Sequence, residues 1–409
     1  MFKFLSLLLF FPSITFGLLS AEVFPWGILF SAFYMRHFSK SMLVLVGLLF
    51  ASSFYVLMAP LITDVYLETD VIRSLAAYMN VILVSQTLLV LSEKRLVDLG
   101  LLSRKIFWGL IALGVIQSFG SDMLGHVIQL LVPRGEGGAL VESNRGVTLL
   151  ATEPARAGIE LTLIYLIYRM SRRTNGKQEI LTDLLVIAFQ ALVIKSASSL
   201  AFSCGAFAIL YFRIKSDLLS FFSTVIFTAV MAFFVVILLP KVGGRAGDLV
   251  LYLSEMESIS EALFYMANES GNRLLALYSF FISGLHHPLG FGIGGWPYSS
   301  MIAVLESGLD YSDFRFFDVV ANGELIPFRG PGIVSNLLLD VGILGVIVFF
   351  YLFGKSILQY YSFNDVSRKA FFIFIFKISL FGSPGNPVIF IFFITVFCLT
   401  SNRKHFVSK

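Results

Sequence analysis

Two stretches of this sequence collect arginines, carboxylates and histidines of the kind that handle phosphorylated ligands. The first, residues 122–156, ends with Arg145, Glu153 and Arg156 just before an apolar segment. Guanidinium groups bind phosphate oxygens through two parallel hydrogen bonds and keep their charge, so this spacing predicts a phosphate or diphosphate site. The alternative is that these arginines face lipid headgroups or pair with Glu142 and Glu153.

The second stretch begins at Arg273, continues through an apolar helix and ends in His286 and His287. One histidine can accept a proton; the alternative is an interfacial histidine bonded to a loop carbonyl. Adjacent histidines point in different directions from a helix, so no zinc site is predicted. The following GFGIGG satisfies G-x-G-x-x-G but lacks the strand that a dinucleotide site needs. We expect its glycines to turn the backbone towards the membrane, where its amides can approach an anion.

Charged residues inside apolar segments form a third set of candidates. Glu160, Lys195, Asp340 and Lys377 lie where a charge costs about 2.5–3.5 kcal/mol on insertion scales, so each needs a partner or a wet cavity. A structural pair between helices, such as Lys195 with Glu160, satisfies this need. Lys377 can instead extend towards an interface. Asn336 lies one helical turn before Asp340, so both can line one face.

The composition indicates whether water or lipid surrounds the helices that carry these residues. Of 409 residues, 57% are hydrophobic and only 14% are charged, against about 25% charged in soluble domains. With a mean hydropathy of +0.85, this excludes an ordinary soluble enzyme and predicts an all-α polytopic membrane protein. The net charge of +4 is too small to suggest nucleic-acid binding. Both cysteines, Cys204 and Cys398, lie in apolar runs and are expected to be small buried residues.

Runs of about 20 apolar residues predict twelve spans, with eleven as the alternative. The predicted spans are 3–20, 22–38, 41–60, 72–92, 105–121, 155–170, 180–196, 198–213, 218–239, 331–354, 367–382 and 386–401. The first run also has features of a signal peptide, but its cleavage pattern is poor and a retained helix is favoured. The whole chain, 1–409, is predicted to be one membrane domain.

The distribution of basic residues predicts the orientation, because short loops rich in lysine and arginine stay in the cytoplasm. If the N-terminus is inside, cytoplasmic segments hold 19 of the 30 basic residues, and both termini are cytoplasmic. Residues 122–154 then form the first long external loop, and residues 240–330 form a large one between the ninth and tenth spans. A loop of that length is expected to contain helices, with 273–285 on the membrane surface.

Three stretches are similar to the bacterial O-antigen polymerases, which share a fold with the O-antigen ligases. The stretches are GVTLLATEPARAGIE, which enters the sixth span; NRLLALYSFFISGLHHPLGFGIGGW, with an arginine, an apolar helix and Pro-Leu-x-Gly-x-Gly; and SNLLLDVGILGVIVFFYLF, with an asparagine at the start of the span after the large loop. The resemblance implies a GT-C-like glycosyltransferase of the bacterial inner membrane. It implies transfer of a growing glycan from undecaprenyl diphosphate to the next lipid-linked repeat unit at the periplasmic face, without metal or cofactor.

The resemblance also assigns roles by position. The implied substrate-binding residues are Arg145, Arg156, Arg273, Asn336 and Asp340. Glu153 is the first candidate for the base or a base-orienting group, with His286 or His287 as the alternative. Implied partners are undecaprenyl-diphosphate-linked oligosaccharide, membrane lipid and a chain-length regulator protein.

Two other functions remain open at this point. Ligases commonly have a histidine before the asparagine that begins the span after the large loop, whereas Ser335 precedes Asn336 here. This departure favours a polymerase, and a ligase that transfers glycan to lipid A core is the first alternative. A polysaccharide exporter or flippase is the second. Many transporters have two similar halves, but no internal repeat is visible in this sequence.

Overall fold

The computed structural model describes most of the chain. The described residues are 1–15, 24–63, 70–119, 122–132, 146–171, 177–211, 251, 255, 258, 273–313, 316–317, 321–382 and 384–401. Every regular element within these ranges is a helix. The predicted all-α class is therefore confirmed for the described part of the chain.

Four of the described helices are long and apolar enough to cross a membrane. They are α3 (Lys40–Thr63), α4 (Val71–Val90), α5 (Glu93–Ser118) and α18 (Ile333–Tyr360). Helix α3 leaves large apolar side chains exposed along its length, including Leu43, Leu48 and Phe54. Exposed apolar surface on a helix of spanning length suits contact with lipid, so these helices support a membrane protein.

The other described helices are shorter. They are α1 (Phe2–Leu9), α2 (Pro25–Tyr34), α6 (Asp122–Leu131), α8 (Pro154–Met170), α9 (Lys177–Phe189), the π-helix η1 (Gln190–Ile194), α10 (Ala197–Tyr211), α15 (Arg273–His286), α16 (Trp296–Glu306), the 3₁₀-helix η3 (Tyr311–Asp313), α19 (Asp365–Leu380) and α20 (Val388–Thr400). Eleven predicted spans overlap a described helix, whereas 218–239 lies outside the described residues. With 8 and 10 residues, α1 and α2 are shorter than a bilayer crossing needs, so the count of twelve stays a prediction.

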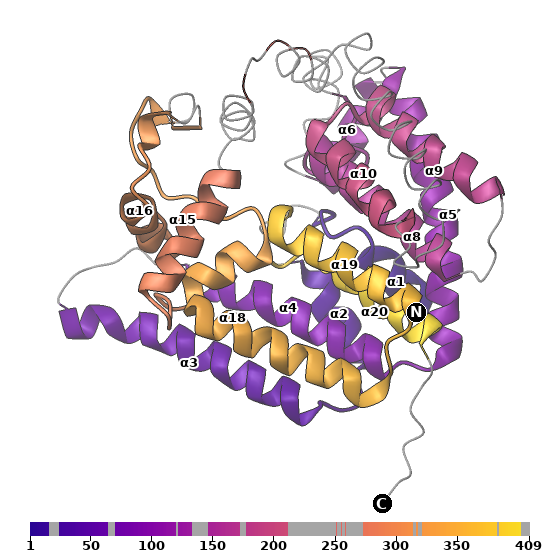
Figure 1. Ribbon diagram of the computed structural model, residues 1–409. Helices are drawn as coiled ribbons and strands as arrows, with labels where there is room; N and C mark the ends of the chain where they lie inside the picture. The colour runs from indigo at the N-terminus through magenta and orange to yellow at the C-terminus, as the bar shows by residue number, and fades with distance from the viewer. Residues whose placement is uncertain are drawn as a thin grey trace, which may run out of the picture.

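Helix α20 forms the centre of the fold. It packs against α4, α5, α8 and α19, and every residue from Val388 to Cys398 is buried. A helix that is apolar on all sides can be enclosed in this way. Figure 1 shows α3, α4 and α18 running side by side, while α5, α8, α9 and α10 form a second group. Helix α20 contacts both groups, so it joins them into one body.

Helix α18 is broken at Gly342, and the loop after α15 compensates for the break. Gly342 has φ 65° and ψ −177°, which interrupts the helical hydrogen bonds. The amide of Phe291 donates to the carbonyl of Leu339 at 3.0 Å, and the amide of Gly292 donates to the carbonyl of Asp340 at 2.7 Å. Broken helices are tolerated at membrane depth only where other backbone or side-chain groups satisfy the freed polar atoms. The glycine-rich loop therefore turns back as expected, but these amides bind α18 carbonyls rather than an anion.

Candidate functional site

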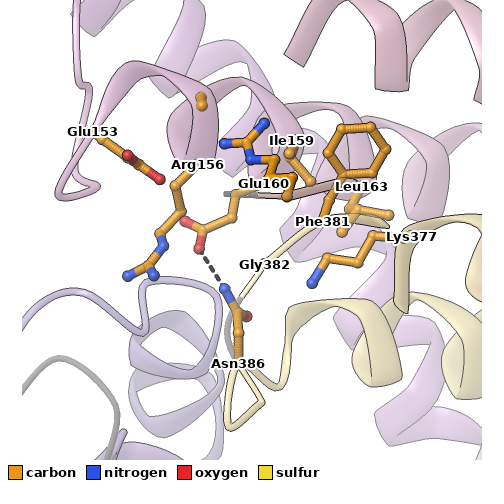
Figure 2. A pocket seen from close by; sticks show the side chains of 11 residues that line it. Glu153, Arg156, Ile159, Glu160, Leu163, Lys377, Phe381, Gly382 and Asn386 are labelled. Carbon is orange, nitrogen blue, oxygen red and sulfur yellow. Dashed lines mark hydrogen bonds between the residues drawn. The ribbon is translucent and has the colours of Figure 1, made fainter. Parts of the chain in front are cut away.

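A charged pocket lies where α8, α15 and α20 begin and α19 ends. It is small and partly open to solvent, with a cavity volume of about 30 Å³. Its lining residues are Glu153, Ala155, Arg156, Ile159, Glu160, Leu163, Arg273, Lys377, Phe381, Gly382 and Asn386 (Figure 2). Three predicted site residues, Glu153, Arg156 and Arg273, therefore come together in one place, although 120 positions separate the first from the last.

Helix α8 supplies one wall of the pocket. Pro154 is the first residue of the helix, where its missing amide donor costs no hydrogen bond, and Glu153 is the residue before it. Arg156 follows three positions after Glu153, and Glu160 follows four positions later, so the three side chains lie on one helical face. The remaining positions of α8 are mostly apolar and buried, which fixes this polar face towards the pocket.

Glu160 forms the floor of the pocket. Its side chain is 6% exposed, and Asn386 Nδ2 donates to Glu160 Oε1 at 2.8 Å. Arg156 and Lys377 interact electrostatically with this carboxylate and flank it in Figure 2. A buried carboxylate needs such compensation, because an unpaired charge is expensive away from water.

The structure corrects the expected partners of the membrane-embedded charges. Glu160 accepts a hydrogen bond from Asn386 and interacts electrostatically with Arg156 and Lys377, whereas Lys195 follows η1 in a left-handed conformation with φ 51°. Lys377 is 4% exposed and lines the pocket. Glu160 therefore has the compensation that its burial requires, but the lysine near it lies on a different helix from the one predicted.

The turn between α19 and α20 supplies the opposite wall. Gly382 has φ 98°, and a side chain there would collide with Lys377 Nζ, so glycine makes room for the ammonium group. Asn80 Nδ2 on α4 donates to the carbonyl of Gly385 at 2.9 Å. This bond anchors the turn next to Asn386 and thereby holds the amide that contacts Glu160.

The pocket has the electrostatics of an anion site. Arg156, Arg273 and Lys377 provide three cationic groups, and Glu153 and Glu160 provide two carboxylates. Arg273 donates to Ser198 Oγ near the start of α10, so a fourth helix begins close by. Helix N-termini carry partial positive charge and unpaired amides. Converging helix starts and arginines favour an oxyanion such as phosphate.

The first candidate for the base lies at the opening of this pocket. Glu153 is exposed at the mouth, where a ligand hydroxyl can reach its carboxylate. Arg145 lies outside the described residues, so its role remains a prediction. Its neighbour Gly146 is described, and the amide of Val147 donates to the carbonyl of Val193 at 3.2 Å beside η1.

The two histidines lie at the far end of α15 from the pocket. His286 follows Arg273 by thirteen positions, which corresponds to about 20 Å along a helix axis. His287 Nε2 is 2.7 Å from Glu306 Oε1 on α16, and Ser283 Oγ donates to Glu306 Oε2 at 2.8 Å. Burial raises the pKa of Glu306, but these hydrogen bonds and the adjacent histidines outweigh it, so the pKa lies below its usual value. The structure thus separates the histidines from the phosphate candidates.

Asn336 and Asp340 are both buried, and both bind protein groups. Asn336 Nδ2 donates to the carbonyls of Gly330 and Gly332, which closes the start of α18. Tyr78 on α4 donates through its hydroxyl to Asp340 Oδ2 at 2.7 Å. The two residues share α18, as their spacing predicted, but neither lines the charged pocket.

Lys377 and Asn386 are the pocket residues that reasoning from the sequence did not assign to a site. Lys377 lies in the last turn of α19 and Asn386 in the turn that follows, where the sequence signal is weak. Lys377 was recognised as an embedded charge, and Asn386 stands between Gly385 and Pro387 in a turn-like sequence. The spacing of Glu153, Arg156 and Glu160 was the signal that could have added Glu160 to the site.

The described residues contain no group of three or more His, Cys, Asp or Glu side chains arranged to hold a metal ion. Comparisons with protein-family models, with curated proteins and with solved structures find no match to this chain.

Proposed function

We propose that this protein is a membrane glycosyltransferase that uses a lipid-diphosphate-linked oligosaccharide, as an O-antigen polymerase does. The observation that carries the proposal is the charged pocket, in which Arg156, Arg273 and Lys377 converge at the ends of apolar helices. A lipid diphosphate places its chain in the membrane and its anionic headgroup at the boundary. The pocket matches this division between apolar and charged parts.

The pocket residues suit the departure of a diphosphate. In the proposed reaction, an acceptor hydroxyl oxygen attacks the anomeric carbon of the donor sugar, and the bond from that carbon to the diphosphate oxygen breaks. The diphosphate leaves with the bonding electron pair, and cationic side chains stabilise the charge that develops on it. Arg156, Arg273 and Lys377 take this role.

The two carboxylates have different roles in this proposal. Glu153 is exposed at the pocket mouth and takes the proton of the acceptor hydroxyl. Glu160 is buried and already accepts a hydrogen bond from Asn386, so it holds Arg156 and Lys377 in place. Glu160 is therefore a positioning residue rather than the base.

Arg273→Ala tests the proposal in the strain that carries the gene. Removing one group that stabilises the leaving charge is expected to lower transfer at least about a hundredfold, so long polysaccharide chains should disappear while single repeat units remain attached. The measurement is the length distribution of the polysaccharide on a gel, together with the amount of inserted protein. Arg36→Ala is the matched control, because Arg36 is exposed and lies outside the pocket.

The pattern of loss separates the candidate functions. Long chains at the wild-type level in Arg273→Ala would refute the role of the pocket. In a strain without the gene, loss of every attached unit would indicate a ligase instead. Accumulation of lipid-linked units on the inner leaflet would indicate a flippase.

A further inference from the structure

A serine from another helix contacts one of the pocket arginines. Arg273 is the first residue of α15 and lines the charged pocket, and its Nη1 atom donates to the hydroxyl of Ser198 on α10. The body of α15 packs against α16, α18 and α19, whereas α10 packs against α8 and α9. The bond therefore connects two parts of the fold. Arg273 makes other interactions as well, so Ser198 is one of the groups that hold it.

Ser198 follows a break between α9 and α10. The chain passes from α9 into the π-helix η1, and the amide of Lys195 donates to the carbonyl of Gln190 at 2.8 Å, five positions earlier. Lys195 has a left-handed conformation with φ 51°, and α10 begins two residues later at Ala197. Residues other than glycine rarely adopt this conformation, and π-helical turns are rare. Together they change the direction of the chain just before Ser198.

Both sides of this break are anchored on α8 at Gly158. Gln190 Nε2 donates to the carbonyl of Gly158 at 2.7 Å. A side chain at Gly158 would collide with Gln190 and with Ser199, so glycine allows η1 and α10 to approach α8 closely. Gly158 stands between Arg156 and Glu160, which line the charged pocket. The anchor therefore lies on the segment of α8 that forms the pocket wall.

The segment before α8 contacts the same break. The amide of Val147 donates to the carbonyl of Val193 at 3.2 Å, and a side chain at Gly146 would collide with the carbonyl of Ile194. Strained backbone persists only where the surrounding structure fixes it, and it clusters at functional sites. These contacts and the anchor on Gly158 hold Lys195 in its unfavourable conformation.

We propose that Ser198 is a positioning residue for Arg273, and that the break at η1 and Lys195 holds the serine hydroxyl in place. A guanidinium group is a rigid planar fork, so a hydroxyl that accepts from Nη1 restricts the orientation of the whole group. Ordering a long side chain before the ligand arrives lowers the entropic cost of binding. This inference rests on the proposed function, in which Arg273 meets the diphosphate of the donor.

Binding of inorganic diphosphate to the full-length protein in phosphatidylcholine nanodiscs tests the role of Ser198. Isothermal titration calorimetry measures the Kd. Ser198→Ala should weaken binding at least about tenfold, because the ligand must then order Arg273 itself. Ser198→Thr keeps a hydroxyl group and should bind within about threefold of the wild-type protein. Wild-type affinity in Ser198→Ala would overturn the inference.

Ser203→Ala is the matched control on the same helix. The hydroxyl of Ser203 is 2.7 Å from that of Thr162 and donates to the carbonyl of Ser199 at 2.8 Å, and Ser203 does not line the pocket. Its loss removes helix-to-helix bonds of α10 but leaves the contact to Arg273. The Kd of this variant should therefore stay within about threefold of the wild-type value.

A double-mutant cycle shows whether Ser198 acts through Arg273. In an Arg273→Ala background, Ser198→Ala should change the Kd less than about twofold, because the side chain that it positions is gone. A loss of equal size in both backgrounds would overturn the positioning role, since Ser198 would then act on binding by another route.

Two substitutions at Lys195 separate the backbone conformation from the charge. Both Lys195→Gly and Lys195→Val remove the ammonium group, but glycine adopts the left-handed conformation without strain and β-branched valine rarely adopts it. Lys195→Gly should keep the Kd within about threefold, whereas Lys195→Val should raise it at least about tenfold. Lys195→Thr is the β-branched substitute if thermal unfolding shows that Lys195→Val does not fold. Equal Kd values for Lys195→Gly and a folded β-branched variant would overturn the role of the break.

Calorimetry and glycan transfer together separate this inference from the proposed function. A wild-type protein that binds diphosphate but transfers no glycan would refute the proposed function, while the binding losses of Ser198→Ala and its rescue by threonine would still support the positioning role. Normal transfer together with wild-type binding in Ser198→Ala would refute the positioning role alone. A wild-type protein that does not bind diphosphate would overturn both.

Discussion

At the residue scale, two carboxylates of the charged pocket differ in their access to solvent. Glu153 and Glu160 both line the charged pocket, as Arg156 does. Only Glu153 is exposed enough to meet a hydroxyl group, since Glu160 is 6% exposed and hydrogen-bonded to Asn386. Access to the substrate, rather than proximity to the cations, therefore decides which carboxylate is the better candidate for the base.

Glu153→Gln is expected to lower kcat by about 10²–10⁴-fold, because an amide cannot take the proton of the acceptor hydroxyl. KM should change little, since Arg156, Arg273 and Lys377 remain to contact the proposed diphosphate. The measurement is the rate of glycan transfer between purified lipid-linked units. Glu324→Gln is the control, because Glu324 is an exposed carboxylate outside the pocket. A kcat within about threefold of the wild-type value would remove Glu153 as the base.

The sequence predicted one half of the pocket, and the reason is local. Glu153, Arg156 and Arg273 each lie at the start of a helix. In the sequence, each is therefore a charged residue at the border of an apolar run. Lys377 and Asn386 carry no comparable mark. Their positions in the pocket depend on how the end of α19 and the turn after it lie against α8, and periodicity along the chain does not encode those contacts.

At the element scale, the break in α18 and the glycine-rich loop form one structural unit. Gly290, Gly292 and Gly294 all have positive φ, between 70° and 93°. A side chain at Gly290 would collide with backbone atoms of α18 at the break. The apparent nucleotide-binding motif is therefore a loop that satisfies the hydrogen bonds of a broken helix, which only the contact with α18 reveals.

Gly290→Ala should destabilise the protein more than an alanine at another left-handed glycine. The left-handed conformation alone costs an alanine about 1–2 kcal/mol, and the clash with α18 should raise the loss to at least about 3 kcal/mol. Gly308→Ala is the matched control, because Gly308 has φ 69° with open space around it. Thermal unfolding in detergent measures both. Equal losses in the two variants would show that the contact with α18 is unimportant.

The pair of Glu306 and His287 should make the packing of α16 on α15 depend on pH. The pKa of Glu306 is lowered in the folded protein, so its carboxylate stabilises the fold above the unfolded value of about 4.3. That contribution is lost as the pH falls through the lower folded pKa. Amide exchange in α16, corrected for intrinsic rates, should therefore be steady above about pH 5 and accelerate in more acidic solution.

Glu306→Gln provides the test of that pH dependence. Glutamine does not ionise, so the variant should show faster exchange in α16 at neutral pH and no further acceleration in acid from this pair. His286 and His287 remain in the variant, which isolates the carboxylate as the titrating group. An unchanged acid response in Glu306→Gln would assign the effect to other groups.

Predictions about elements were more successful than predictions about contacts. Eleven of the twelve predicted spans overlap described helices, and four of these helices are long and apolar enough to cross a membrane. The interruption of α18 was not predicted, although Gly342 is visible in the sequence. An apolar run with one glycine reads as a continuous helix until the loop that replaces its hydrogen bonds is known.

At the scale of the whole molecule, two independent properties indicate the same side of the membrane. The loop charges predict that α8, α10, α15 and α20 begin on the external side and that α19 ends there. The fold brings these same helix ends together around the charged pocket. The first property depends on lysines and arginines in loops, and the second depends on packing. Their agreement supports an external pocket, where a glycan already carried across the membrane would be extended.

The sidedness itself is open to a direct test with single cysteines in a Cys204→Ala, Cys398→Ala background. Glu324→Cys should react with a membrane-impermeant maleimide in intact spheroplasts, because residue 324 is exposed in the predicted external loop. Lys94→Cys should react only after lysis, because Lys94 is exposed and belongs to a predicted cytoplasmic loop. Arg36→Cys, on a different loop, should behave as Lys94→Cys does. The opposite labelling would place the charged pocket in the cytoplasm, where the acceptor and donor would be untransported lipid-linked units.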